Sequence, residues 1–462
     1  MSDFVLDTEK LDRLIEASFP ELEKDLLALV SCPSVEGEAS LGAPFGEGVA
    51  QALSCALDIC RRLGLEAHDV DGYCGYADLK GTEETQVGVL AHLDVVPARP
   101  EDWQTPPFAP EVRDGVIYGR GVIDDKGPLL AALYGLRALA ELGFSPRKTV
   151  RVIMGCNEET HMACMDHYLS KFAPPSCGFT PDASWPLIVG EKGVLHYALE
   201  KSWQPEKTEG PALLSLFCGV APNVVPASAE AVLRGVELPE ALPEGVSCET
   251  DGGETVVHAA GAAAHGSTPY EGDNALSKLL RFLDGLTFGP APARDFVAAA
   301  ARLNRDDCYG ADMGVAGEDA RSKVTHAPTM CRIEEGKARL TCDLRFLLSR
   351  RTDDYLPLIS QKAAENGLTL AEYDGAEPLW LGEDHPLAGV LLSSYRDVTG
   401  DMSDPLVIGG GTYAKKFPNF LAFGPEDPTR PTLAHQADEH MSRSALRDAA
   451  RIYARALYAL AK

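Results

Sequence analysis

Two imidazoles and three carboxylates stand where an apolar run ends or a polar loop begins, and a metal ion could gather them. They are His92, Asp124, Glu159, Asp182 and His435. Imidazole nitrogens and carboxylate oxygens suit zinc, and they also bind manganese or cobalt. Three carboxylates and one bridging hydroxide would neutralise two divalent cations. If these residues converge, their charge therefore favours two metal ions over one.

Each of these residues also has an ordinary structural interpretation. A histidine such as His92 is often a hydrogen-bonded core residue. Asp124 and Asp125 precede a predicted helix and could cap its N-terminus. The adjacent Glu158 and Glu159 could lie in a solvated loop. Taken singly, the histidine and the glutamate pair favour these interpretations, so a metal centre depends on the convergence of all the ligands.

Predicted strands would position several of these residues. The apolar run 87–90 predicts a short buried strand that ends at His92, and a second run, 149–156, leads into Glu158 and Glu159. In open α/β sheets, ligands bind beyond the carboxyl ends of strands. Asp94 lies two residues after His92 and could accept the hydrogen of its second ring nitrogen, which would fix the tautomer.

The wider pattern predicts an α/β protein with an inserted domain. Helices are expected at 8–31 (as one or two helices, with Pro20 opening the second), 46–64, 128–142, 386–399 and 442–460. From about residue 193 the character changes to strand-like alternation with proline-containing linkers, and near residue 378 the first pattern resumes. We therefore predict a catalytic domain in two parts, 1–192 and 378–462, and an inserted α+β domain at 193–377.

The bulk composition narrows the functional class. The chain has 462 residues, and its formal net charge of -27 argues against nucleic-acid binding, which needs clustered basic residues. Its 12 cysteines include no C-x-x-C pair and are typical of buried thiols in a reducing compartment. The N-terminal sequence has no signal-peptide pattern, and no apolar run reaches 18 residues. We expect a cytoplasmic protein that does not enter a membrane.

Five motifs in register carry a family resemblance. They are HLD, GRGVIDDKGP, NEET, TPD and HQADE, and they contain the five candidate ligands. In this order and spacing the chain resembles the dinuclear zinc metallopeptidases that include glutamate carboxypeptidase, aminoacylase and carnosinase. The DDKGP form, GFTPDA with EKG downstream, the long insert and GGGTYA resemble the bacterial PepV-type dipeptidases in particular. The resemblance implies a zinc-peptidase-like catalytic domain, with a mixed sheet between helices, and an inserted α+β lid.

The resemblance also assigns the ligands to two divalent metal ions, zinc in the first place and manganese or cobalt as alternatives. Asp124 would bridge the two ions. His92 and Asp182 would complete one metal site, and Glu159 and His435 would complete the other.

The same resemblance implies the roles of two further carboxylates. Glu158 would be the general base that takes a proton from a metal-bridging water, and Asp94 would orient His92. The family also implies a cis peptide between Asp124 and Asp125. The chemistry is reasonable on general grounds, because a divalent cation can lower the pKa of bound water to about 7 and a nearby carboxylate can accept its proton.

The inserted domain would supply most substrate contacts. The resemblance implies that His265 stabilises the oxyanion, Asn223 contacts the substrate, and Arg345 pairs with its C-terminal carboxylate. Backbone amides for the same carboxylate would come from Gly410, Gly411 and Thr412. Without the resemblance, His265 would be interpreted as a loop histidine and Arg345 as part of a strand-surface ion pair.

Three residues near these motifs fit less well. Lys415 follows GGGTYA, where these dipeptidases have arginine, which puts carboxylate contacts there in doubt. His161 and His440 lie close to proposed ligands, and we treat both as non-ligands.

Together these features predict a metal-dependent dipeptidase that acts on dipeptides with free amino and carboxyl termini. The insert is larger than one lid subdomain needs, so we expect a second lid half to replace a partner subunit and the protein to be a monomer. The alternatives are an N-acyl amino acid deacylase of the same clan and a non-catalytic, metal-dependent peptide-binding protein.

Overall fold

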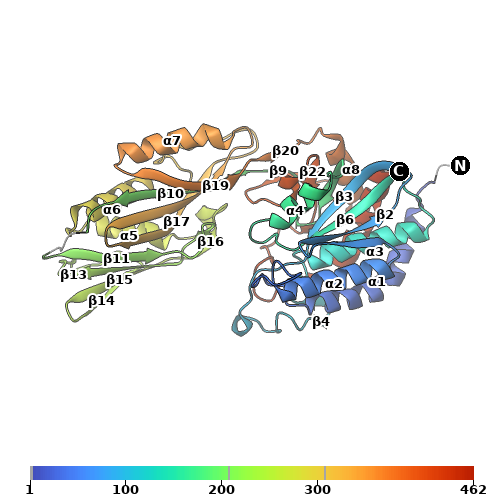
Figure 1. The fold of residues 1–462 in the computed structure, drawn as a ribbon, viewed down its shortest axis with the longest axis horizontal. Coiled ribbons are helices and arrows are strands. Elements are labelled where there is room, and N and C mark those ends of the chain that lie inside the picture. Colours follow the sequence, from blue (N-terminus) through green and yellow to red (C-terminus); the bar gives the residue numbers. More distant parts are fainter. Residues whose placement is uncertain (1–3, 206–208, 306–307) are drawn as a thin grey trace. The chain divides into compact units, whose positions relative to one another are not determined.

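The structure is a computed structural model that describes residues 4–205, 209–305 and 308–462. The chain divides into two compact units (Figure 1). The first comprises Met1–Gly190, Leu381–Leu406 and Thr412–Lys462, and the second comprises Glu191–Trp380 and Val407–Gly411. Among the described residues, no helix has both the length and the apolar character needed to cross a bilayer.

The first unit is built on a mixed sheet in the order β1-β2-β6-β3-β7-β22-β9. The strand bounds are β1 (Glu66–Val70), β2 (Cys74–Leu79), β3 (Glu83–His92), β6 (Lys148–Gly155), β7 (Cys177–Thr180), β9 (Ile188–Glu191) and β22 (Phe420–Ala422). Strands β6, β3, β7 and β22 run parallel to their neighbours in this series. The short strands β20 (Leu379–Trp380) and β21 (Leu406–Ile408) pair beside β9. This arrangement confirms the predicted α/β class with a mixed sheet.

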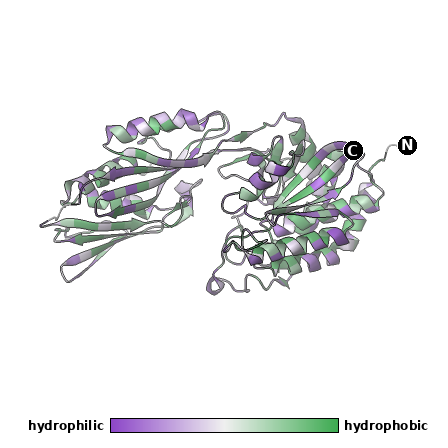
Figure 2. Cartoon of the chain, viewed as in Figure 1, coloured by the Kyte–Doolittle hydropathy of each residue, from purple (hydrophilic) through white to green (hydrophobic). Residues whose placement is uncertain are grey.

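Helices cover this sheet, and the end of β3 is buried on both faces. The helix bounds are α1 (Thr8–Val30), α2 (Glu47–Arg62), α3 (Lys126–Glu141), α4 (Ala163–Lys171), α8 (Pro386–Thr399) and α9 (Arg443–Ala461). Helices α3 and α9 pack on each other and on β3, while α1 packs on α3. Figure 2 shows hydrophobic and hydrophilic residues alternating along α1 and α2, as amphipathic helices require. The N-terminal prediction resolves to one helix, which continues through Pro20.

Shorter elements complete the first unit. They are β4 (Glu111–Arg113), β5 (Val116–Tyr118) and β24 (His440–Ser442) in one small sheet, β8 (Ala183–Ser184) paired with β23 (Pro425–Glu426), and the 3-10 turns η1 (Pro100–Asp102) and η3 (Tyr413–Lys416). Strand β24 brings the segment after His435 next to the loop that follows β5.

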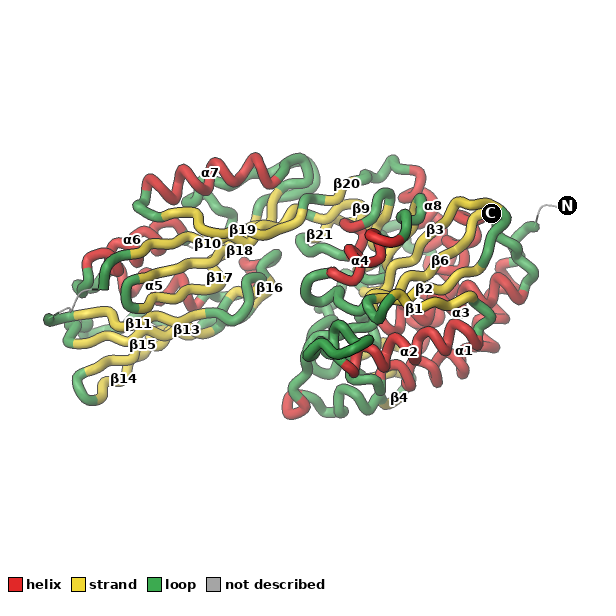
Figure 3. The backbone as a smooth tube through the Cα atoms, in the orientation of Figure 1, coloured by secondary structure: helices red, strands yellow, loops and turns green. Residues whose placement is uncertain are grey.

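The second unit is an antiparallel sheet in the order β14-β15-β13-β11-β17-β18-β10-β19 (Figure 3). The strand bounds are β10 (Gly193–Ser202), β11 (Ala212–Cys218), β13 (Ser228–Arg234), β14 (Val246–Asp251), β15 (Glu254–Ala260), β17 (Thr325–Glu334), β18 (Lys337–Phe346) and β19 (Thr369–Ala376). Helices α5 (Ala275–Asp284), α6 (Ala291–Leu303) and α7 (Thr352–Glu365) pack on it. Alternate residues of β13 and β15 are buried, as expected when helices cover one face.

A two-stranded ribbon also belongs to the second unit. Strand β12 (Val224–Val225) pairs with β16 (Ala264–His265), and the turn η2 (Pro269–Glu271) follows. The ribbon places His265 opposite Val224, next to the predicted substrate residue Asn223.

Candidate metal centre

His92 ends β3, and its ring is fully buried. Its Nδ1 lies 2.9 Å from the main-chain carbonyl oxygen of Asp94, whereas the nearer carboxylate oxygen of Asp94 is 3.7 Å away. The carbonyl therefore accepts the Nδ1 hydrogen, a task that the sequence interpretation gave to the Asp94 carboxylate. That carboxylate instead accepts the main-chain N–H of Glu159 at 3.0 Å. Asp94 thus positions two candidate ligands, one through its backbone and one through its side chain.

Asp124 lies between two imidazoles. Its Oδ1 is 2.8 Å from Nε2 of His92, and its Oδ2 is 3.0 Å from Nε2 of His435. The peptide bond that follows it, Asp124–Asp125, is cis, as the resemblance implied. Burial opposes ionisation of Asp124, but the two histidines hold the pKa of its carboxyl well below the usual range. One carboxylate with each oxygen facing a different imidazole has the geometry of a bridging ligand.

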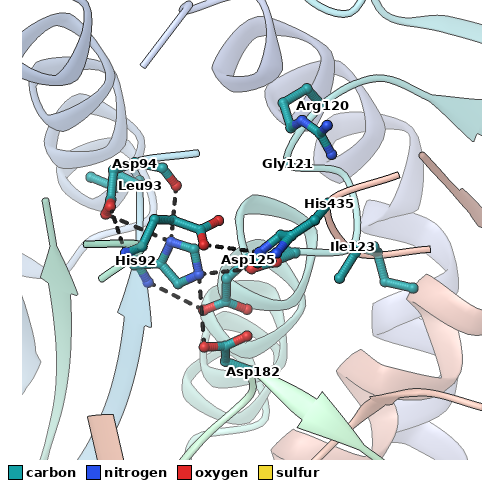
Figure 4. Close-up of polar contacts among 12 residues, drawn as sticks. His92, Leu93, Asp94, Arg120, Gly121, Ile123, Asp125, Asp182 and His435 are labelled. Carbon is teal, nitrogen blue, oxygen red and sulfur yellow. Dashed lines mark hydrogen bonds and ion pairs between the residues drawn. The ribbon is translucent and has the colours of Figure 1, made fainter. Parts of the chain in front are cut away.

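The other predicted ligands lie around the same point. Glu159 is 2.9 Å from Nε2 of His435, and Asp182 is 3.8 Å from Nε2 of His92. Figure 4 shows His92, Asp182 and His435 converging from three separate segments. Among the described residues, two overlapping groups have donor atoms within 4.8 Å of one another, namely His92–Glu158–Asp182 and His92–Asp124–Glu159.

Glu158 lies beside these ligands and is partly buried. Its Oε1 has no hydrogen-bond partner within the described part of the chain. Burial and the negative charge of Asp182 raise the pKa of the Glu158 carboxyl well above its usual value. Burial and Asp124 likewise raise the pKa of Asp182 to about 8. Carboxylates crowded in this way need protons or cations to neutralise them.

Despite burial, the nearby carboxylates raise the pKa values of the two histidines, which favours their charged form. Burial opposes the charge on His435, yet its hydrogen bonds with Asp124 and Glu159 raise its pKa to about 11. Protonated imidazoles therefore balance the carboxylates where a cation would otherwise do so. Two imidazoles, several close carboxylates and an unpartnered buried carboxylate oxygen make a donor set that fits a divalent metal ion.

The sequence analysis did not identify Glu439, which holds the loop before Asp124 in place. Glu439 is fully buried and forms a 2.8 Å ion pair with Arg120. Its carboxylate also accepts the main-chain N–H groups of Gly121 and Ile123 at 2.9–3.0 Å. Glu439 follows His435 by four residues, so a single segment supplies one ligand and holds the loop of another. The available signals were the GRG sequence around Arg120 and the glutamate that ends HQADE.

Replacement of this support is expected to weaken metal binding. Glu439→Gln puts an amide against backbone N–H groups and leaves Arg120 buried without its counter-charge. We expect metal affinity to fall about 10- to 100-fold and the free energy of unfolding to fall by about 2–4 kcal/mol. Metal titration and urea unfolding measure the two effects.

The matched control is Asp78→Asn. Asp78 forms a bidentate 2.8 Å pair with Arg151, which is also buried in the first unit. Asp78→Asn should lower the free energy of unfolding but keep the metal affinity of the wild type. Equal losses of metal affinity in the two variants would contradict a specific role for Glu439.

The DDK sequence contributes two further buried residues. Asp125 precedes α3, but the described chain contains no side-chain cap made by it. Its Oδ2 instead accepts the His92 main-chain N–H at 3.2 Å. Lys126 is also buried, and its Nζ donates to the carbonyls of Leu29 and Cys32 at 3.2 and 3.0 Å. The alternative of a simple helix cap therefore does not describe this turn.

The residues expected to bind substrate lie mainly in the second unit. Asn223 accepts the Gly266 main-chain N–H at 2.7 Å through its carbonyl, which joins the segments before β12 and after β16. Arg345 is buried on β18, and its Nε and Nη2 each donate to Asp343 at 2.7 Å. Its Nη1 donates to the carbonyl of Gly409 at 3.1 Å. The ion pair of Arg345 is therefore internal and not at the strand surface.

The glycine-rich run crosses the boundary between the units. Gly410 and Gly411 belong to the second unit, and Thr412 belongs to the first. The Thr412 side chain accepts the Ala414 main-chain N–H at 3.1 Å and caps η3, which contains Lys415.

The two histidines predicted not to bind metal lie outside both ligand groups, as does the predicted ligand His435, which contacts the cluster through Asp124 and Glu159. His161 is exposed. The Nδ1 of His440 contacts the Asp438 carbonyl at 2.7 Å, and its ring lies against Tyr118.

Comparison with known protein families identifies the chain as a peptidase. The chain belongs to the peptidase family M20/M25/M40, whose model matches residues 88–459, and it is therefore a hydrolase of a family that uses divalent metal ions. The resemblance predicted from the motifs is confirmed at the level of this family.

Its curated relatives include named dipeptidases. The chain is 34% identical over 440 residues to the putative dipeptidase YtjP of Bacillus subtilis (strain 168), and the matched region covers 92% of this chain and 94% of the relative. It is 33% identical over 467 residues to the Beta-Ala-Xaa dipeptidase of Lactobacillus delbrueckii subsp. lactis, with 97% and 98% covered.

Solved structures share the fold at low sequence identity. The di-peptidase Dug1p from Saccharomyces cerevisiae matches with a TM-score of 0.64 at 13% identity, over 98% of each chain. The aminoacylhistidine dipeptidase from Vibrio alginolyticus matches with a TM-score of 0.58 at 15% identity, over 96% of each chain.

Proposed function

We propose that this chain is a PepV-type dipeptidase that uses two divalent metal ions, zinc in the first place, to hydrolyse dipeptides with free amino and carboxyl termini. The observation that carries the proposal is the Asp124 carboxylate, with His92 on one oxygen and His435 on the other. The identity to two dipeptidases over nearly the whole chain supports the choice of substrate.

The first unit provides the reacting groups in this proposal. His92 and Asp182 would hold one ion, Glu159 and His435 would hold the other, and Asp124 would be shared by both. When bound, the ions supply a water of low pKa and a positive charge for the carbonyl oxygen of the substrate. Glu158 would accept a proton from the attacking water on its carboxylate and return it to the leaving amine. Asp94 keeps His92 and Glu159 in place.

The second unit provides the substrate contacts in this proposal. Arg345 pairs with the C-terminal carboxylate, because its guanidinium is oriented by the two bonds to Asp343 and keeps further N–H groups for a ligand. Asn223 contacts the substrate, and the amides of Gly410, Gly411 and Thr412 serve the same carboxylate. His265 donates a hydrogen bond to the developing oxyanion. The reach between the metal ions and Arg345 would limit the length of the substrate.

Arg345→Lys should separate binding from chemistry. Lysine keeps the charge but loses the planar fork, so KM for a dipeptide is expected to rise about 10- to 100-fold with a smaller change in kcat. A dipeptide with an amidated C-terminus should lose the difference between variant and wild type. Steady-state kinetics on both substrates measure this.

The control is Arg339→Lys. Arg339 lies on the same strand, and its Nη1 donates to Glu200 at 2.7 Å. Its replacement should leave KM unchanged. An equal KM for the wild type and Arg345→Lys would rule out Arg345 as the carboxylate-binding residue.

The substrate class is tested by rates on Ala-Ala and β-Ala-Ala dipeptides and on N-acetyl amino acids, with the metal-loaded protein. Hydrolysis of the dipeptides is expected. Faster turnover of N-acetyl amino acids would establish the deacylase alternative. Metal-dependent binding of peptides without turnover would establish the binding protein.

The same proposal includes a monomer. The second unit extends over residues 191–380 and contains both an eight-stranded sheet and the β12–β16 ribbon, which is more than one lid subdomain needs. Analytical ultracentrifugation of the loaded protein should give a mass near 49.5 kDa. An obligate dimer would contradict this part of the proposal.

A further inference from the structure

The environment of His265 distinguishes its two ring nitrogens. The main-chain N–H of Ser267 lies 3.2 Å from Nδ1. The Ser267 hydroxyl oxygen lies 2.7 Å from the same nitrogen. Both groups belong to the residue that follows Gly266 at the end of β16. The side chain of one serine and its own amide therefore face one nitrogen of the proposed oxyanion-binding histidine.

The chemistry of the amide determines the direction of these bonds. A backbone N–H can only donate, so Nδ1 must present its lone pair to Ser267. The serine hydroxyl can donate or accept, and beside an accepting Nδ1 it donates. A neutral imidazole carries one hydrogen, which must then reside on Nε2.

From this geometry we propose that Ser267 is a positioning residue that holds His265 in the Nε2–H tautomer. This inference rests on the proposed function, in which His265 donates a hydrogen bond to the carbonyl oxygen of the substrate. The opposite tautomer would present a lone pair at Nε2, and two lone pairs repel. Ser267 thus makes His265 a donor without contacting the substrate itself.

Ser267 is itself held by a directed hydrogen-bond chain. The Lys192 ammonium donates to the Thr325 hydroxyl at 3.2 Å and to the Lys323 carbonyl at 2.7 Å. Because an ammonium cannot accept, the Thr325 hydroxyl hydrogen is directed to the Ser267 carbonyl, 3.2 Å away. Lys192 and Thr325 are both buried, so this end of the hydrogen-bond chain is shielded from water.

Close packing on both sides restricts the same segment. A Cβ atom on Gly266 would lie 2.1 Å from Oδ2 of Asp343, and one on Gly409 would lie 2.5 Å from Cβ of Ser267. Neither glycine has room for a side chain. The backbone can therefore approach Asp343 and Gly409 closely, which keeps the Ser267 amide directed at His265.

Nitrogen NMR measures the tautomer directly. The metal-loaded protein, labelled with ¹⁵N-histidine, is recorded at neutral pH, and the His265 signals are assigned by their loss in His265→Asn. We expect Nδ1 to resonate as an unprotonated ring nitrogen and Nε2 as a protonated one. Ser267→Ala keeps the amide at 3.2 Å but removes the hydroxyl donor at 2.7 Å, so the second tautomer should become partly populated and the two shifts should move toward each other. A wild-type ring with its hydrogen on Nδ1, or on both nitrogens, would overturn the proposal.

Kinetics supply the second test. Ser267→Ala should lower kcat for a dipeptide about tenfold with KM unchanged, because the lost hydrogen bond supports a transition-state contact. Thr325→Val should lower kcat in the same direction by a smaller factor. The control is Thr329→Val, since Thr329 is also buried on β17 and donates its hydroxyl to the Thr341 carbonyl at 3.3 Å. It should keep the wild-type kcat.

The two measurements separate the two proposals. A wild type without dipeptide turnover would defeat the proposed function, while the NMR shifts would still decide the tautomer. An active wild type whose kcat is the same in Ser267→Ala, or is lowered equally by Thr329→Val, would defeat the role of Ser267 alone.

Discussion

Glu158→Gln is expected to lower kcat for dipeptide hydrolysis by about a thousandfold, within the range attributed to a positioned general base. Glutamine has the same shape but cannot accept a proton at neutral pH. The Oε1 atom of Glu158 is buried and has no partner within the described chain, so a change at this atom breaks no hydrogen bond. Steady-state kinetics with metal analysis of the same sample measure the effect.

Glu159→Gln is the matched comparison because it alters the adjacent carboxylate. Glu159 lies 2.9 Å from His435 and is proposed to hold a metal ion. Its replacement should lower the metal content, whereas Glu158→Gln should keep the wild-type content. If Glu158→Gln retained wild-type turnover, or if both variants lost metal equally, the division of roles between the two glutamates would be wrong.

Removal of metal by a chelator is expected to abolish turnover and to destabilise the protein. Ligand binding at about a thousand times Kd stabilises a native state by about 4 kcal/mol, so the free energy of unfolding should fall by about this amount. Activity should return on addition of zinc, manganese or cobalt. Urea unfolding of the chelated and loaded protein measures the difference, and equal stability with full activity after chelation would contradict a metal centre.

The metal-free protein should also become less stable as pH rises. Burial and Asp124 raise the pKa of Asp182 to about 8, from 3.8 as the reference value. Between these pH values the native state keeps a proton that the unfolded chain releases. The contribution of this proton to the free energy of unfolding is complete below pH 3.8 and is lost as pH rises through 8. The slope is at most about 1.4 kcal/mol per pH unit for one proton.

The metal-loaded protein should show little of this dependence of stability on pH, because a bound cation keeps the Asp182 carboxylate ionised. Asp182→Asn in the metal-free protein should remove the contribution of this group. Metal-free stability that increases between pH 5 and 8 would contradict the effect. Unfolding curves at both pH values, with and without metal, are the measurement.

Local pattern was sufficient to predict where several candidate ligands lie. His92 ends β3, Asp182 follows β7, and Glu158 and Glu159 follow β6. Strands β3 and β6 are apolar runs and were predicted, whereas β7 was not, because the segment 178–183 was interpreted as a loop. Parallel pairing of β3 with β6 and β7 brings the ends of the three strands together. The order of strands was not predictable, because β22 takes its place beside β7 from a segment about 240 residues later in the chain.

Contacts made by main-chain atoms or by distant residues were beyond sequence reasoning. The Asp94 carboxylate was expected on His92, but the carbonyl accepts that hydrogen, and no side-chain pattern encodes such a choice. Glu439 stands 318 residues from Gly121, whose N–H it accepts. From the sequence, a glutamate that follows an aspartate is expected in a solvated loop, but the fold buries Glu439 against Arg120. The tautomer of His265 likewise depends on the direction of one backbone N–H.

The interrupted path of the chain through the first unit has a consequence for synthesis on the ribosome. Strand β7 lies inside the sheet, but its neighbour β22 is made only after the whole second unit. At 5–20 residues per second, the interval is roughly 10 to 50 s. During that time the nascent sheet has an unpaired apolar edge, which is a site for wrong strand pairing. His435 and Glu439 arrive later still, so the proposed metal centre has its full set of ligands only in a nearly finished chain. The antiparallel second unit is free to fold before the first unit is complete.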